Sequence, residues 1–217
     1  MMGWLLKKGP TDPDAIAVAG ELAQFLADDP DGDGRDLIKP LLLKMLSDFA
    51  PIVWRPFGRA VVQDRTQAWR IEHALGDSWS FGGEKKPPIL KVPADILFAW
   101  AHANPESAPA FLARVLPVLK TQKVGAEHVF HPLVLRLLNE FGARDDVHRG
   151  LVQNMHTFGW SGSLTTYYAL YEQPLRSLAD HPIGAVRRWA QITLASMRKQ
   201  IESAKMEDDE QDAEWNA

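Results

Sequence analysis

The 217-residue chain contains no cysteine. This absence excludes a disulfide framework and a thiolate metal site within the sequence, and it favours a reducing compartment, so we expect a cytoplasmic protein. A long hydrophobic run is also missing. The apolar residues near the start give way to Lys7 and Lys8 after a few positions, far short of the roughly 20 residues that cross a bilayer. We therefore expect no membrane segment.

Motifs with defined chemistry are absent or incomplete. No glycine-rich phosphate loop ending in Lys-Ser or Lys-Thr occurs. Residues 29–40 begin like an EF-hand calcium loop, but the twelfth position, which must supply a bidentate carboxylate, is Pro40. The run GWSG at 159–162 resembles the Gly-x-Ser-x-Gly elbow of serine hydrolases, yet its second glycine stands one place too early. We expect no catalytic residue and no cofactor.

Apolar residues recur at helical spacing along most of the chain. Steps of three and four run through residues 13–28, 41–49 and 61–75 and continue after residue 93. No alternation of period two is long enough to indicate a strand. Prolines follow Asn104 and His131, at positions that suit the first turn of a helix. We expect an all-α fold of stacked antiparallel helix pairs, arranged as an α-solenoid or an irregular α-α superhelix.

Composition divides the chain into four parts. Residues 77–92 contain adjacent glycines, adjacent prolines and a lysine pair, which do not continue a helix, so we expect a loop there. This loop separates an N-terminal helical part, 1–76, from a C-terminal helical part, 93–205. Residues 206–217 carry six acidic residues and no basic one, and we expect a disordered tail.

The run HPIGAVRRWAQITLASM, residues 181–197, resembles the start of the second helix in HEAT-type repeats. In that pattern a proline, here Pro182, precedes Val-Arg, an alanine and a leucine. The corresponding residues are Val186, Arg187, Ala190 and Leu194. The resemblance implies that Val186 and Ala190 pack inward, and that Arg187 and its neighbour Arg188 divide between a tie to the adjacent helix and solvent.

Residues 158–205 are also similar to the C-terminal segments of bacterial helical-repeat proteins attached to signal-transducing or antiviral NTPases. This similarity implies an interaction scaffold in a bacterial defence or signalling assembly, and it does not imply the NTPase. The prolines that start helices, Pro105, Pro132 and Pro182, are unequally spaced, whereas regular HEAT repeats have a period of roughly 40 to 47 residues. The expected repeat is therefore HEAT-like and irregular.

The main functional prediction is a non-catalytic scaffold or adaptor that binds a protein partner. Among the eight tryptophans, Trp69, Trp100 and Trp189 occupy apolar helical positions and are expected in the core. Trp54 with the adjacent Arg55 is typical of an interface hot spot, or else packs between two helix pairs. The residues expected to contact the partner are Trp54, Arg55, Trp79, Phe81, Trp160, Tyr168 and Arg188.

Two alternative functions remain open. His128 and His131 lie one turn apart, and with a distant carboxylate such as Glu140 they suggest a metal-dependent enzyme, although His131 is also placed to cap a helix. A helical-repeat nucleic-acid binder is the second alternative, and its phosphate contacts would be Arg187, Arg188, Arg198 and Lys199. Without the acidic end, the net charge of −4 becomes about +2, which disfavours nucleic acid.

Overall fold

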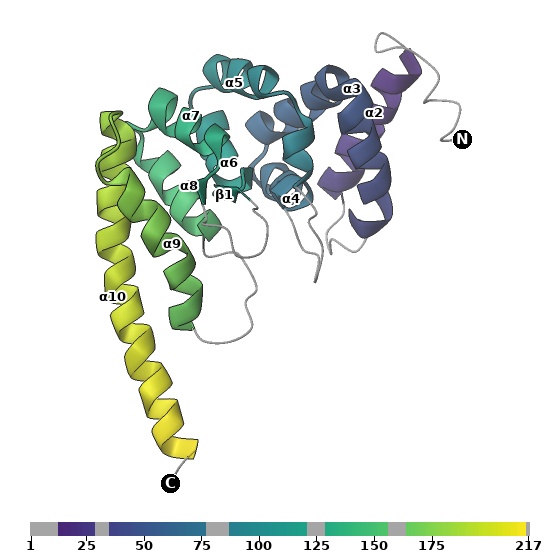
Figure 1. The fold of residues 1–217 in the computed structure, drawn as a ribbon. Coiled ribbons are helices and arrows are strands. Elements are labelled where there is room, and N and C mark those ends of the chain that lie inside the picture. Colours follow the sequence, from purple (N-terminus) through teal and green to yellow (C-terminus); the bar gives the residue numbers. More distant parts are fainter. Residues whose placement is uncertain (1–12, 29–34, 77–86, 121–128, 156–163, 216–217) are drawn as a thin grey trace. The chain divides into compact units, whose positions relative to one another are not determined.

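The computed structural model describes residues 13–28, 35–76, 87–120, 129–155 and 164–215. Contacts within the chain define two compact units, one ending at Leu116 and the other beginning at Pro117. The units therefore divide after α6, and not within the 77–92 segment that the sequence suggested. The described residues are mostly helical, which confirms the all-α prediction (Figure 1).

The first unit is formed by helices. In chain order they are α2 (Pro13–Asp28), α3 (Arg35–Gln63), α4 (Arg65–Gly76), the 3-10 helix η1 (Pro88–Lys91), α5 (Ala94–Ala103) and α6 (Ala108–Val115). Helices α2 and α4 pack against α3, and α6 packs against α4. Pro51 cannot donate a backbone hydrogen bond inside α3, and the helix kinks nearby, at Phe49 (φ −136°, ψ 31°).

The predicted loop at 77–92 is partly helical. Residues Pro88–Lys91 form η1, in which Pro88 and Ile89 are buried. The adjacent prolines favour this tight turn because their fixed dihedral angles suit a helix start, and burial of Ile89 holds the turn against α3 and α4. Trp79 and Phe81 lie outside the described residues.

In its described residues, the second unit combines a two-stranded pair with four helices. Its elements are β1 (Leu119–Lys120), β2 (Val129–Phe130), α7 (Pro132–Phe141), α8 (Asp145–Met155), α9 (Leu164–Leu178) and α10 (Gly184–Trp215). The strands are antiparallel, with Leu119 opposite Phe130. The sequence did not indicate them, because two residues are too few to show a period. Among the helices described, none has the length and apolar content needed to span a membrane.

Helix α10 is the longest element of the second unit. It packs against α9 and α7, and Figure 1 shows it continuing well past the start of α9. The composition of the chain suggested that this helix ends at residue 205 and that a disordered tail follows, but α10 continues to Trp215. Neither glycine nor proline follows Gly184 in the sequence, so no residue type there interrupts the helix.

Candidate protein-binding surface

Trp54, the expected interface residue, belongs to the core of the first unit. Only 3% of it is exposed, and its ring meets the ring of Trp100 edge to face at 5.1 Å. Trp100 in turn meets Phe111 at 5.8 Å in the same geometry. The three rings join α3, α5 and α6. The predicted exposure of Trp54 is therefore wrong, and the alternative, packing between helices, describes its position.

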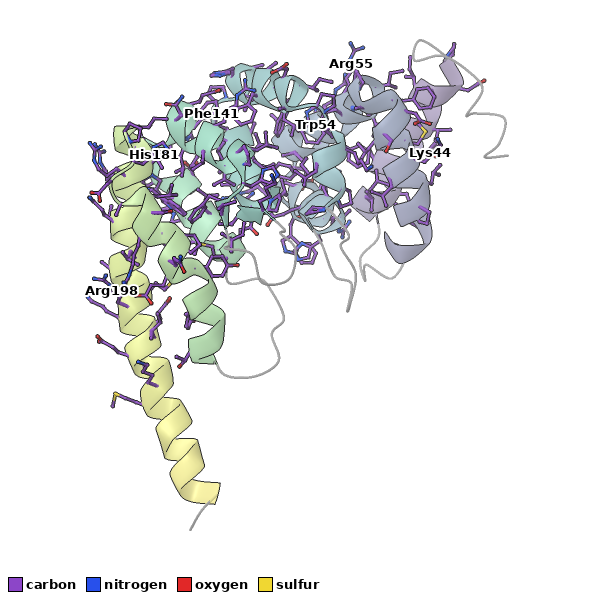
Figure 2. The ribbon with its side chains drawn as sticks, in the orientation of Figure 1. Lys44, Trp54, Arg55, Phe141, His181 and Arg198 are labelled. Carbon is purple, nitrogen blue, oxygen red and sulfur yellow. The ribbon has the colours of Figure 1, made fainter. Side chains whose placement is uncertain are left out.

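A glycine makes room for this aromatic cluster. Gly58 lies one turn after Trp54 on α3, and a Cβ atom there would lie 2.7 Å from Nε1 of Trp100. The missing side chain lets the indole approach the backbone of α3 closely. Figure 2 shows Arg55 extending from the outside of α3 while Trp54 turns inward.

Trp69 shows the opposite deviation from the prediction. It was expected in the core, yet 53% of it is exposed. The buried stripe of α4 consists of Ala68, Ile71 and Leu75, with Ala74 beside it. Trp69 follows Ala68 directly and is therefore rotated by about 100° from that stripe. A large aromatic side chain lies on the outer side of the helix as a result.

The exposed indole of Trp69 is held in place by its own helix. The rings of Trp69 and His73 are 4.3 Å apart at a tilt of 47°, and Nδ1–H of His73 donates to the carbonyl oxygen of Trp69 at 2.9 Å. Thr66 is exposed one turn before Trp69, and Arg70 is half-buried beside it. We call these four residues, Thr66, Trp69, Arg70 and His73, the Trp69 face.

The helix that carries the Trp69 face is fixed at its start and along its length. Oδ1 of Asp64 accepts hydrogen bonds from the backbone N–H of Thr66 at 2.7 Å and of Gln67 at 3.1 Å, which caps α4. Nε of Arg114 on α6 donates to Oε2 of Glu72 at 2.6 Å. The Trp69 face is thus presented on a rigid element.

The remaining residues of the predicted site are scattered. Arg55 and Arg188 are exposed, on α3 and α10, and Tyr168 of α9 is half-buried. Trp160 lies outside the described residues, as do Trp79 and Phe81. The structure does not gather the described members into one patch within either unit. Trp189 is 1% exposed, which confirms its predicted core position, and Trp100 is half-buried.

The residues proposed for a metal site have other roles. His131 caps α7 through Nδ1, which accepts from the backbone N–H of Leu133 at 3.3 Å. Glu140 pairs with Arg136 at 2.7 Å, near the other end of α7 and about 14 Å from His131 along the helix axis. His128 lies outside the described residues. Within the described ranges, no group of three or more His, Asp or Glu side chains is arranged to hold a metal ion.

The four basic residues proposed for phosphate contacts all lie on α10. Nη1 of Arg187 donates to the carbonyl oxygen of His181 at 2.8 Å, across the turn that precedes the helix. Arg188, Arg198 and Lys199 are exposed, and Figure 2 shows Arg198 extending from the side of α10. They are spread over three turns of the helix, so they do not form a compact anion site.

No family model matches the chain, and no curated protein or solved structure shows significant similarity to it.

Proposed function

We propose that the protein is a non-catalytic helical scaffold that binds a protein partner through the Trp69 face of its first unit. The observation that carries this proposal is the exposure of Trp69 on a fixed helix. Tryptophan is enriched among the side chains that dominate binding energy at interfaces, because it buries a large area for few rotatable bonds. Among the exposed large apolar side chains described in the first unit, Ile16, Phe25, Val62 and Trp69, the tryptophan is therefore the strongest anchor for a partner.

The surroundings of Trp69 suit such an anchor. Its contact with His73 restricts the indole before binding, so little further side-chain entropy is lost on association. Thr66 and Arg70, on the same face of α4, provide hydrogen-bond donors, as the polar and partly hydrated rim of an interface usually does. We infer a partner that offers an apolar pocket for the indole and carbonyl or carboxylate oxygens around it.

We also propose that the helices form HEAT-like pairs, as the resemblance implied. Three observations support the proposal. Val186, Ala190 and Leu194 of α10 are buried, Arg187 bonds to the turn before its helix, and Nε2 of Gln191 donates to the carbonyl oxygen of Ala179 at 3.0 Å. Membership of a bacterial defence or signalling assembly belongs to the same proposal and rests on the resemblance alone.

The test uses a photoreactive amino acid at position 66, one turn from Trp69. The tagged full-length chain, expressed in its native cells, is irradiated and the cross-linked species are identified by mass spectrometry. We expect one dominant partner whose yield falls at least tenfold in Trp69→Ala. The stability of the variant should change by no more than about 0.5 kcal/mol, since the side chain is largely exposed.

Phe25→Ala is the matched control. Phe25 is also a large exposed aromatic residue of the first unit, 44% exposed on α2. The cross-linking yield at position 66 should be the same in this variant as in the wild type. Equal losses in both variants would show nonspecific apolar adhesion, and an unchanged yield in Trp69→Ala would refute the proposed surface.

A further inference from the structure

One side of α10 carries apolar and charged residues at a regular spacing and faces away from the unit. Ile192 is 59% exposed and Met206 is 65% exposed. Three more exposed residues lie between them at steps of three and four. We call the set the outer stripe: Ile192, Ala195, Lys199, Glu202 and Met206. Alternating steps of three and four match the a and d spacing of a coiled coil, with the charged Lys199 and Glu202 at two positions that are apolar in most coiled coils.

The opposite side of α10 already has neighbours. Val186, Ala190, Leu194 and Met197 are buried, and the helix packs there on α9 and α7. Among the described side chains of α10, none beyond Met197 is buried. The outer stripe is therefore a second helical face on the same element, exposed along its length in the described part of the chain.

The charges of α10 are divided between its two ends. Five basic residues, at 187, 188, 198, 199 and 205, lie before residue 206, with Glu202 as the sole acid among them. Residues 207–214 then contain six acidic residues and no basic one. Two such helices repel when parallel, since the acidic ends coincide. When antiparallel, each acidic end lies beside a basic half.

We propose that the outer stripe binds a second copy of this chain, with the two α10 helices antiparallel about a two-fold axis. The axis passes between residues 200 and 201, near the middle of the helix. Lys199 of each copy then lies opposite Glu202 of the other, and Ala195 lies opposite Met206. The same register places residues 207–214 of one copy beside 187–194 of the other, where Arg187 and Arg188 lie.

This register is self-complementary, as a two-fold interface requires. The two Lys199–Glu202 contacts are related by the axis, so both form or neither does. Met206 of one copy lies over Ala195 of the other copy. The small side chain of Ala195 leaves space for the methionine between the two helices. The occupant is a second copy because the complementary charge lies on the same helix, and the inference is independent of the Trp69 face.

Charge exchange tests the register. Lys199→Glu and Glu202→Lys each create two like-charge contacts, so we expect the dissociation constant of the homodimer to rise at least tenfold in each variant. An equimolar mixture of the two variants should form a heterodimer, since every contact at the axis then joins opposite charges. The double variant with both residues exchanged should dimerise like the wild type. Sedimentation velocity measures each case, and circular dichroism checks that helix content is unchanged.

Arg59→Glu is the control for the charge reversals, because Arg59 is exposed on α3 in the first unit. It should leave dimerisation unchanged. The proposal would be overturned if the wild-type chain stayed monomeric at a concentration on the order of 100 micromolar. It would also be overturned if neither single charge reversal changed the dissociation constant of the dimer. Trp69→Ala should dimerise normally, which separates this inference from the proposed partner-binding function.

Engineered cysteines test the antiparallel direction, since the natural sequence has none. Mixing Ala195→Cys with Met206→Cys should give a disulfide-linked heterodimer under mild oxidation. Each variant alone should cross-link slowly, because its two cysteines would lie 11 positions apart, about 16 Å along the pair. Fast cross-linking of Ala195→Cys with itself would show parallel helices and refute the proposed arrangement.

Discussion

The two units differ in the aromatic packing that joins their helices. In the first unit, aromatic rings from α3, α5 and α6 interlock over a glycine that admits them. The second unit also buries an aromatic pair, Phe130 with Trp189, and its helix starts carry side-chain hydrogen bonds, as the start of α4 does in the first unit. His131 caps α7, and Asp146 accepts from the N–H of Val147 at the start of α8. The comparison separates long-range packing from local capping as sources of stability.

Replacement of Trp54 gives the largest expected effect. Trp54→Ala removes a side chain that is 3% exposed and leaves a cavity beside Trp100, so we expect a loss of about 3–5 kcal/mol in the free energy of unfolding. Urea denaturation followed by circular dichroism measures it. Trp69→Ala, in the same unit, should cost no more than about 0.5 kcal/mol. Similar losses in the two variants would contradict the assigned positions of these tryptophans.

Gly58→Ala tests the aromatic cluster by overpacking. The added methyl group would meet Nε1 of Trp100 at 2.7 Å, and the indole is constrained by Trp54 and Phe111. We expect a loss of about 1–3 kcal/mol in the free energy of unfolding. Gly20→Ala on α2 is the control, since nothing lies within 4 Å of its added Cβ, and it should stabilise by up to about 1 kcal/mol, the difference in helix propensity between the two residues. A Gly58→Ala variant as stable as the wild type would show that Trp100 moves freely.

Local features were predictable from the sequence, and long-range ones were not. The cap at His131 involves residues two positions apart, so the His-Pro pair at a helix start was sufficient to predict it. The burial of Val186 and Ala190 followed from a pattern within one helix. Trp54 lies in apolar helical sequence that does not show what covers it, and it is Trp100 of α5, far along the chain, that packs against its ring.

The position of Trp69 relative to the buried stripe of α4 explains why it was expected in the core and is exposed instead. On α4, Ala68, Ile71 and Leu75 alone satisfy the helical period, and Trp69 lies outside that stripe. The helical period of α4 by itself therefore predicts that Trp69 is exposed. The length of α10 was underestimated for another reason: the acidic run after residue 206 suggested a tail, whereas the absence of glycine and proline lets the helix continue.

The cap of α7 allows a smaller and more local test. His131→Ala removes the acceptor for the N–H of Leu133, and we expect a loss of about 1 kcal/mol in the free energy of unfolding. His131→Asn should stay close to the wild type, because asparagine caps helices well. Urea denaturation of the two variants distinguishes capping from a packing role of the imidazole. Equal losses in both would show that the ring itself, and not its acceptor nitrogen, stabilises α7.

Replacement of Asp146 gives the smallest expected effect on stability, and this effect depends on pH. Arg144 donates to this carboxylate through Nη2 at 2.7 Å and Nε at 3.0 Å, and these bonds lower the pKa of Asp146 below its ordinary value while partial burial opposes the shift. A carboxyl whose pKa is lower in the folded than in the unfolded state stabilises the fold above the unfolded pKa, about 3.9. That contribution disappears as the pH falls through the folded pKa.

Asp146→Asn should therefore be less stable than the wild type at pH 7, and the difference should shrink steadily as the pH falls below about 4. Thermal denaturation across pH 2 to 7 measures the difference. Asp145→Asn is the matched control, because Asp145 occupies the same first turn of α8 and is exposed. Its replacement removes the same charge from the helix start without breaking the bonds to Arg144. If both variants showed the same pH profile, the interaction of an acid with the helix dipole would account for the whole effect, and the ion pair with Arg144 would add nothing to the stability of α8.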